Sequence, residues 1–348
     1  MIAGLYLTRV VAVRILAVLL GIAALAVGLD MVENATEVIS RHGADKLAEY
    51  ALLRLPVILL TVLPLCVLIG AVLGFLTMAM RSEMVVLRAA GLNTIRMLAL
   101  MIPLCLALAV THNLLASWLA PAAERALAVK FPRLSDAPKL SRELWLRDWG
   151  AVIRVGSASA GAATLADITI FELDSSGRLS QRIDAAAARY TEGGWTLSQV
   201  HLQLPEPPAQ DLAELRWESR LTPAGIMSAA RRSEMVDASE VRDILSGAVP
   251  GGRGMPFYAM QLWNGYAAFL TPVVMLLFAS LASFGLVRSG GGARYVAISA
   301  AGGVGFILID GVFTSLGEVG AVPAVPAAFL APALFLVLGV WSVVLAEE

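Results

Sequence analysis

Few residue patterns in the 348-residue chain could support catalysis. The segment 156–161 (Gly-Ser-Ala-Ser-Ala-Gly) lacks the Gly-x-Ser-x-Gly spacing of a nucleophile elbow and is expected to be a loop of small residues. The histidines at 42, 112 and 201 are isolated and have no metal-ligand spacing. The sequence contains no Gly-x-x-x-x-Gly-Lys-Ser/Thr motif for holding ATP phosphates. We therefore expect a chain that is not an enzyme and that binds no metal or cofactor by itself.

The most informative charged residues lie in segment 81–91, Arg-Ser-Glu-Met-Val-Val-Leu-Arg-Ala-Ala-Gly. Before it, Leu55 to Met80 contains no charged residue, and after it Met97 to Ala123 contains His112 as its one ionisable group. About 20 apolar residues suffice to cross a bilayer as a helix. Segment 81–91 is therefore predicted to be a short helix between two spans. Its charges either contact a soluble partner or are simply solvated.

The overall composition indicates a membrane protein with several spans. Hydrophobic residues make up 58% of the chain and charged residues 15%, with a mean hydropathy of +0.76. The net charge of −1 argues against a nucleic-acid partner. Both cysteines, Cys66 and Cys105, lie in apolar runs, so no disulfide framework is expected.

The apolar runs predict six spans. They cover about Val11–Leu29, Leu55–Met80, Met97–Ala123, Tyr258–Val287, Tyr295–Leu316 and Val325–Ala346. Ala24-Leu25-Ala26 resembles a signal-peptide cleavage site, but it lies inside the first run, so a retained helix is expected.

Lysine and arginine in the short connections predict which side each connection faces. Seven lie on the side of the N-terminus: Arg9, Arg14, Arg81, Arg88, Arg96, Arg288 and Arg294. Three lie on the opposite side: Arg41, Lys46 and Arg54. Because cytoplasmic loops carry the excess of basic residues, both termini are predicted to be cytoplasmic.

The middle of the chain has a different composition. Residues 121–256 hold 16 of the 26 basic and 17 of the 27 acidic residues. Apolar and polar residues alternate there with period two, and turn sequences separate the runs. This pattern predicts strands near 143–147, 151–155, 164–173, 179–190, 195–204 and 212–221. We predict an all-β domain, a sandwich or jelly roll, inserted on the exported side between the third and fourth helices. A helix is expected near Ser239–Leu245.

Asp310 is the other ionisable group that a span could carry. It follows Arg294 by 16 residues, or roughly 24 Å of helix, which places it near the outer interface. It is either a solvated carboxylate at the end of a span or a group that acts in gating.

Several segments together resemble a known family. Leu68–Gly74 followed by 81–91 resembles the lipopolysaccharide export permeases LptF and LptG, and 81–91 is the most specific part. Further similar segments are Trp118–Pro121, Leu144–Asp148, Trp195–Leu197, Leu221–Pro223 and Leu262–Trp263, so the resemblance covers essentially the whole chain. The amino-acid sequences of 81–91 and of 27–30 (Val-Gly-Leu-Asp) are closer to those of LptG than to those of LptF.

The resemblance implies partners and site residues. It implies a heterodimer of two such permeases in the bacterial inner membrane, with two copies of the cytoplasmic ATPase LptB, the single-span LptC and the periplasmic LptA bridge. ATP would be bound by LptB. Glu83 matches the family's glutamate that contacts the ATPase, and Arg88 and Arg81 are expected to join that contact. Arg41, Lys46 and Arg125 are candidates, by position, for the lipid-binding rim.

The function implied is extraction of lipopolysaccharide from the inner membrane and its transfer to a periplasmic bridge. The domains expected are 1–123 (three spans, with the coupling helix near 81–95), 124–254 (the periplasmic jelly roll) and 255–348 (three spans). Inward-facing apolar residues of the β domain line the lipid path or form only a closed core: Ile168, Ile170, Val200, Leu202 and Trp217. A permease that transmits force to a periplasmic partner without moving lipid is the alternative. An ion-coupled transporter is disfavoured because few charges lie within the spans.

Overall fold

The structure is a computed structural model. It describes residues 2–131, 144–148, 151–159, 162–174, 178–191, 194–203, 210–219, 221–223, 225–226, 237–246, 253–284 and 292–347. The chain divides into two compact units, a helical one formed by Met1–Leu127 with Met260–Glu348 and a second formed by Ala128–Ala259. The sequence placed these boundaries at 123/124 and 254/255.

The first half of the helical unit contains long helices joined by short ones. Its elements are α1 (Ile2–His42), η1 (Ala44–Lys46), α2 (Leu47–Met80), α3 (Glu83–Ala89), α4 (Thr94–Leu100), α5 (Ile102–Leu114), the π-helical η2 (Leu115–Leu119) and α6 (Ala120–Lys130). The predicted coupling region thus consists of two seven-residue helices, α3 and α4, between the second and third spans.

The second half contains the remaining spans. Its elements are α9 (Met255–Ala267), α10 (Thr271–Ser280), η3 (Leu281–Phe284), α11 (Gly292–Glu318) and α12 (Ala324–Glu347). Among the described residues, five helices are long and apolar enough to cross a membrane. The pair formed by Met255–Ala267 and Thr271–Phe284, bent by 49°, makes a sixth span when counted as one. This agrees with the prediction of six spans.

The bend between α9 and α10 has a local cause. Pro272, in the first turn of α10, cannot donate a backbone hydrogen bond to the preceding turn. At the end of α9 the N–H of Phe269 donates to the carbonyl of Tyr266 at 3.4 Å rather than to that of Gly265, and the Gly265 carbonyl accepts a hydrogen bond of 2.6 Å from Nδ2 of Asn113 in α5. The third span therefore supplies the polar group that the broken fourth span needs.

Glycines let α1 and α2 pack with their backbones nearly touching. A Cβ added at Gly70 would lie 2.4 Å from the Cα of Ile15, and one at Gly74 would lie 3.1 Å from a methyl group of Val11. Small residues four apart are typical of close helix pairs in membranes. The glycines at 302 and 303 likewise pack within the chain, against Phe278 and Leu68.

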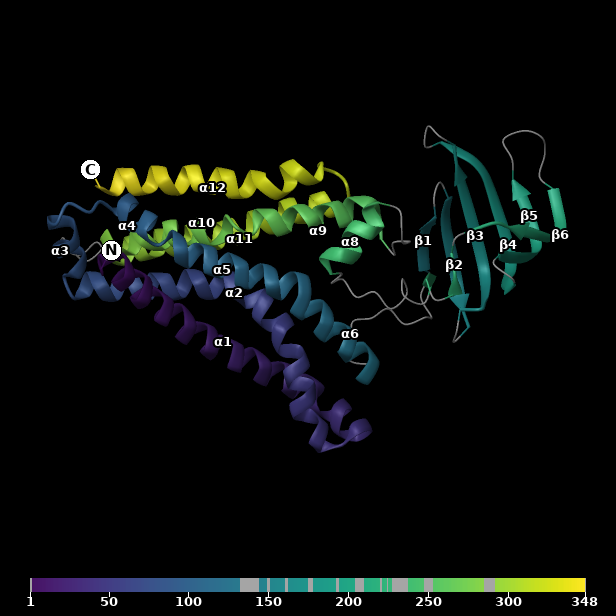
Figure 1. The fold of residues 1–348 in the computed structure, drawn as a ribbon, viewed down its shortest axis with the longest axis horizontal. Helices are drawn as coiled ribbons and strands as arrows, with labels where there is room; N and C mark the ends of the chain where they lie inside the picture. The colour runs from purple at the N-terminus through teal and green to yellow at the C-terminus, as the bar shows by residue number, and fades with distance from the viewer. Residues whose placement is uncertain are drawn as a thin grey trace. The chain divides into compact units, whose positions relative to one another are not determined.

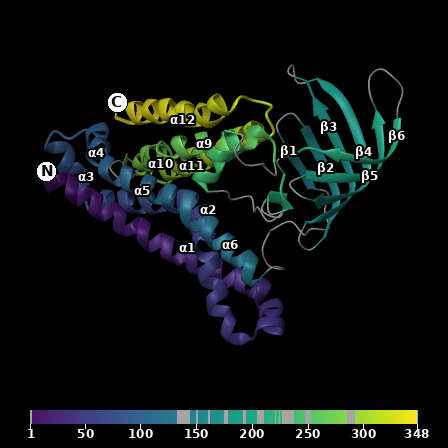
Figure 2. The same cartoon turned by 45° about the vertical axis from the view of Figure 1, so that its right-hand side comes forward.

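The two termini and α3 lie at the same end of the helical unit, where α4 also lies (Figures 1 and 2). The connection between α1 and α2 lies at the other end (Figure 1). The helices thus place the N-terminus, the C-terminus and the loop 81–91 on one side, as the distribution of basic residues predicts.

The second unit contains a six-stranded antiparallel sheet. Its strands are β1 (Leu144–Asp148), β2 (Ala151–Ala158), β3 (Thr164–Leu173), β4 (Leu179–Thr191), β5 (Gly194–Gln203) and β6 (Gln210–Trp217), and each pairs with the next in sequence. The inserted β domain is confirmed, and so is the helix near 239–245, α8 (Ala238–Leu245). The jelly-roll connectivity is not confirmed, because the described strands form a simple meander.

A crease runs across the sheet. Asp167 in β3 and Gln199 in β5 have positive φ angles of 53° and 52°, and each is skipped in the pairing register with its neighbours. On either side of Asp167, Leu165 and Ile168 are both buried, so the alternation of buried and exposed residues changes phase there. Both halves of each strand therefore turn their apolar side chains to the same face.

Candidate functional site

Two residues in the left-handed conformation set the ends of α3. Ser82, with φ 61°, separates it from α2, and Gly91, with φ 85°, follows its C-terminus. The N–H of Gly91 donates to the carbonyl of Arg88 (2.9 Å), and the N–H of Leu92 donates to the carbonyl of Leu87 (3.1 Å). These two bonds form a Schellman motif, whose left-handed position glycine occupies without strain.

The two faces of α3 differ in exposure. Met84 is fully buried in the core of the helical unit, and Leu87 packs against the same core. Val85 and Val86 are 45% and 66% exposed on the other face. Met84 and Leu87 are three positions apart and therefore share one face of the helix. A seven-residue helix is unstable in isolation, so this packing holds α3 in place and leaves an apolar face outward.

Glu83 begins α3, and its carboxylate is oriented by the first helix. The hydroxyl of Tyr6 in α1 donates a hydrogen bond of 2.8 Å to Oε2 of Glu83. Oε1 lies 4.0 Å from Nη1 of Arg81, whose side chain is 67% exposed. An exposed ion pair of this length contributes little. The carboxylate is thus held near the surface, where a partner could reach it.

Arg88 takes a different direction from Glu83. Its guanidinium carbon lies 4.1 Å from the centre of the Phe284 ring, and its Nη2 donates to Oγ of Ser283 at 3.4 Å. Burial lowers the pKa of the Arg88 guanidinium, and the negative charge of Glu347 opposes this. The prediction that Arg88 contacts an ATPase stays untested, and in this chain its side chain faces η3.

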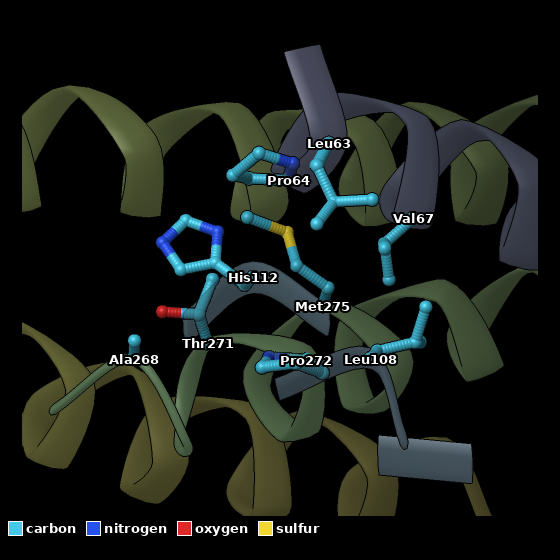
Figure 3. Close-up of a pocket in the computed structure, with 9 residues that line it drawn as sticks. All are labelled: Leu63, Pro64, Val67, Leu108, His112, Ala268, Thr271, Pro272 and Met275. Atoms are coloured by element: carbon cyan, nitrogen blue, oxygen red, sulfur yellow. The ribbon is translucent and has the colours of Figure 1, made fainter. Parts of the chain in front are cut away.

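His112 lines a small apolar pocket between α2, α5 and α10 (Figure 3). The pocket has room for about one water molecule. Figure 3 shows the imidazole beside Pro64 and Met275. The pocket is too small for a lipid chain.

Asp310 lies in α11 and is partly buried. No hydrogen bond or ion pair joins it to another residue that the structure describes. Both interpretations of Asp310, a solvated carboxylate and a gating group, stay open.

The three predicted rim residues are exposed, and each has a local contact. Arg41 pairs with Glu37 one turn earlier in α1. Lys46 pairs with Glu49 at 3.1 Å. Nε of Arg125 donates to a backbone carbonyl of α6 at 3.2 Å. Their proposed role in lipid binding is untested.

A largely buried charge cluster joins α1, α2 and α6. The sequence analysis did not predict it. Arg54 in α2 bonds Oδ1 of Asp30 in α1 through Nη2 and Nε, at 2.8 and 3.1 Å. Its Nη1 lies 3.5 Å from Oε1 of Glu124 in α6, whose side chain is 6% exposed. The distribution of basic residues treats Arg54 as part of a short connection. In the structure its guanidinium forms ion pairs with the carboxylates of Asp30 and Glu124. The signal available in the sequence is that Asp30 and Arg54 both border apolar runs.

The predicted apolar residues of the β domain share one face of the sheet. Ile168, Ile170 and Val200 are almost fully buried, and Leu202 and Trp217 pack against the same cluster. The indole N–H of Trp195, which is fully buried, donates to the carbonyl of Leu221 at 2.8 Å. The pattern prediction of an inward face is confirmed, and a role in lipid passage is not tested by it.

Comparison with known proteins agrees with this architecture. The family model described as lipopolysaccharide export system permease LptF/LptG matches residues 5–344. The lipopolysaccharide export system permease protein LptG of Escherichia coli strain K12 is 25% identical over 301 residues, covering 84% of this chain and 83% of that protein. The protein of the same name from Haemophilus influenzae is 26% identical over 292 residues, covering 81% and 80%. A match over nearly the whole chain, with the spans, the inserted sheet and the short helix 83–89 all present, places this chain in the LptF/LptG family of lipopolysaccharide export system permeases.

Proposed function

We propose that this chain is the LptG-type permease subunit of an ABC transporter that extracts lipopolysaccharide from the bacterial inner membrane. The chain carries no ATP-binding motif and no cofactor of its own in this proposal. Two copies of a cytoplasmic ATPase, LptB, hydrolyse ATP, and a second permease of the LptF type completes the membrane part. The observation that carries the proposal is the family match over residues 5–344, which includes the loop between the second and third spans.

In this proposal α3 is the element that the ATPase moves. Its outward face presents Val85 and Val86, which are apolar and exposed, beside the carboxylate of Glu83. Exposed apolar side chains next to an oriented charge suit a protein groove with a complementary donor. The hydroxyl of Tyr6 orients the carboxylate before the partner binds, which reduces the entropy that binding must overcome.

The lipid enters laterally between helices of the paired permeases and leaves toward LptC and the LptA bridge. The transporter must offset roughly 0.8 kcal/mol for each CH₂ group exposed to water in transit. An apolar face on the β domain would lower this cost, and Ile168 and Val200 belong to such a face, which would have to open to receive acyl chains because both side chains are buried. The β domain is periplasmic and both termini are cytoplasmic in this arrangement.

The first experiment is co-purification of the tagged chain with the candidate ATPase and second permease, comparing the natural sequence with Glu83→Ala. Loss of hydrogen bonds to a charged group should weaken association by about 1.5–3 kcal/mol, roughly tenfold or more. Glu33→Ala, at an exposed glutamate of α1, is the matched control and should leave association unchanged. The proposal fails if the natural chain retains no ATPase in any pairing.

Crosslinking of lipopolysaccharide then separates lipid transport from force transmission alone. A photoreactive group placed between the spans should capture lipid in an ATP-dependent way in the assembled transporter. An ATPase-coupled complex that never captures lipid would instead support the permease that only transmits force.

A further inference from the structure

The inward face of α3 carries a charged residue where an apolar one would be expected. Met84 and Arg88 are one helical turn apart and therefore share a face, and Met84 is fully buried. Arg88 lies against η3, the short helix that ends the bent fourth span. Solvated loop cations stay in water, so this placement indicates a contact within the chain.

The contact is built from complementary groups. The guanidinium lies over the face of the Phe284 ring, the geometry of a cation–π interaction. Oγ of Ser283, which is fully buried, accepts from Arg88 while it donates to the carbonyl of Ser280 at 2.7 Å. Nε of Arg88 is buried without a hydrogen-bond partner among the described residues. Arg88 is partly buried, and removing part of a cation from water is costly without compensation, so these contacts favour this position of its side chain.

A second link joins the other half of the loop to the last helix. Oε1 of Glu347, in the last turn of α12, accepts a hydrogen bond of 2.6 Å from the backbone N–H of Thr94, which begins α4. Thr94 is 1% exposed. The negative charge of Glu347 also favours the protonated form of Arg88 and so raises the pKa of its guanidinium against the effect of burial. The carboxylate therefore acts on both short helices.

These contacts connect α3 and α4 to spans that are not their neighbours in the chain. Through the backbone, α3 and α4 connect only to α2 and α5. Through Arg88 and Glu347 they also connect to η3 and to α12 in the second half of the chain. Packed elements with discrete contacts carry energetic coupling between distant parts of a protein.

We propose that Arg88, Phe284, Ser283 and Glu347 form a latch that ties the α3–α4 segment to the cytoplasmic ends of the fourth and sixth spans, so that displacement of α3 moves both halves of the permease together. Arg88 is then a positioning residue within the chain, and Glu83 is the residue that meets the ATPase. The latch rests on the proposed function, because that proposal supplies the displacement.

The test uses the assembled transporter reconstituted in lipid vesicles. Three quantities are measured for each variant: ATPase retained on co-purification, ATP hydrolysed, and lipopolysaccharide released per ATP. Arg88→Met keeps the length of the side chain and removes its charge, and Phe284→Leu removes the ring. Both should retain the ATPase and lower lipid released per ATP by about three- to tenfold. The double variant should lose little more than either single one, because both remove the same contact.

Arg96→Met is the matched control, since Arg96 lies in α4, is exposed and donates to a carbonyl of the loop rather than to η3. It should leave the ratio of lipid to ATP unchanged, while Arg88→Lys should restore part of the loss. The latch is overturned if Arg88→Met abolishes ATPase retention while Phe284→Leu does not, because Arg88 would then face the ATPase. It is also overturned if both variants keep a normal ratio.

A second measurement keeps the latch testable when no ATPase binds, the result that would defeat the proposed function. The isolated full-length chain in detergent is unfolded thermally as the natural sequence, Arg88→Met, Phe284→Leu and the double variant. A non-additive loss of midpoint supports the contact in the chain itself, and strictly additive losses rule it out.

Discussion

The two charged residues of α3 lie in different surroundings because of their spacing. Glu83 and Arg88 are five positions apart, which is about 140° around a helix of 3.6 residues per turn. Their side chains therefore leave the helix in different directions. Burial of Met84 turns Arg88 inward, and the exposed face keeps Glu83 at its edge. A residue that is charged, in a loop and near a predicted contact is therefore not by itself a contact residue.

At the same scale, Arg54→Met should destabilise the helical unit. The change leaves the buried carboxylates of Asp30 and Glu124 without their shared cation, and breaking a buried pair typically costs about 3–5 kcal/mol. Thermal unfolding in detergent measures the loss. Arg41→Met, which breaks the exposed pair with Glu37, is the control and should cost less than about 1 kcal/mol. Equal midpoints for the two variants would contradict the buried cluster.

Several contacts between elements depend on a glycine, a polar side chain or a residue with unusual backbone geometry. The glycine at position 70 brings α1 and α2 to backbone contact, and a polar side chain, Asn113, stabilises the break in the fourth span. In the sheet, left-handed residues at 167 and 199 bend β3 and β5 so that one face stays apolar on both sides of the crease. In each case a local exception to regular structure determines how two elements meet.

Gly70→Ala tests the α1–α2 contact. An added Cβ would overlap the backbone of Ile15, so the two helices must separate, at a cost of about 1–3 kcal/mol by analogy with overpacked cores. Gly21→Ala, in the same helix pair, has nothing within 4 Å of the added Cβ and should be neutral or stabilise by up to about 1 kcal/mol. Denaturant unfolding followed by circular dichroism compares them. Similar midpoints would show that the helices do not touch at Gly70.

The whole helical unit carries its termini and α3 at one end (Figures 1 and 2). That arrangement requires an even number of crossings between the termini, and six spans satisfy it. The distribution of basic residues then predicts that this end faces the cytoplasm. The β domain follows the third span, so the same rule predicts that it lies on the exported side.

Labelling of single cysteines in intact cells tests this orientation. The natural cysteines at 66 and 105 are buried, so background labelling by a membrane-impermeant maleimide should be low. Ser40→Cys, exposed near the end of α1, should react in cells whose outer membrane alone is permeable. Ala90→Cys, exposed after α3, should react only after the inner membrane is opened. The reverse pattern would invert the topology.

Local patterns in the amino-acid sequence predict the spans, the strands and the loop 81–91, and they carry the resemblance to the family. Apolar runs, period-two alternation and the motif at 81–91 are local properties, because hydration and backbone hydrogen bonding act on each segment separately.

The partners of the charged side chains, in contrast, depend on how the helices pack. Tyr6 and Glu83 are 77 positions apart, Arg88 and Ser283 are 195 apart, and Thr94 and Glu347 are 253 apart. Arg54 and Glu124 are 70 apart. No local pattern encodes such pairs, since each depends on the crossing of helices that meet only after folding. Packing of the spans therefore made Glu83 the accessible charge of α3 and Arg88 the internal one.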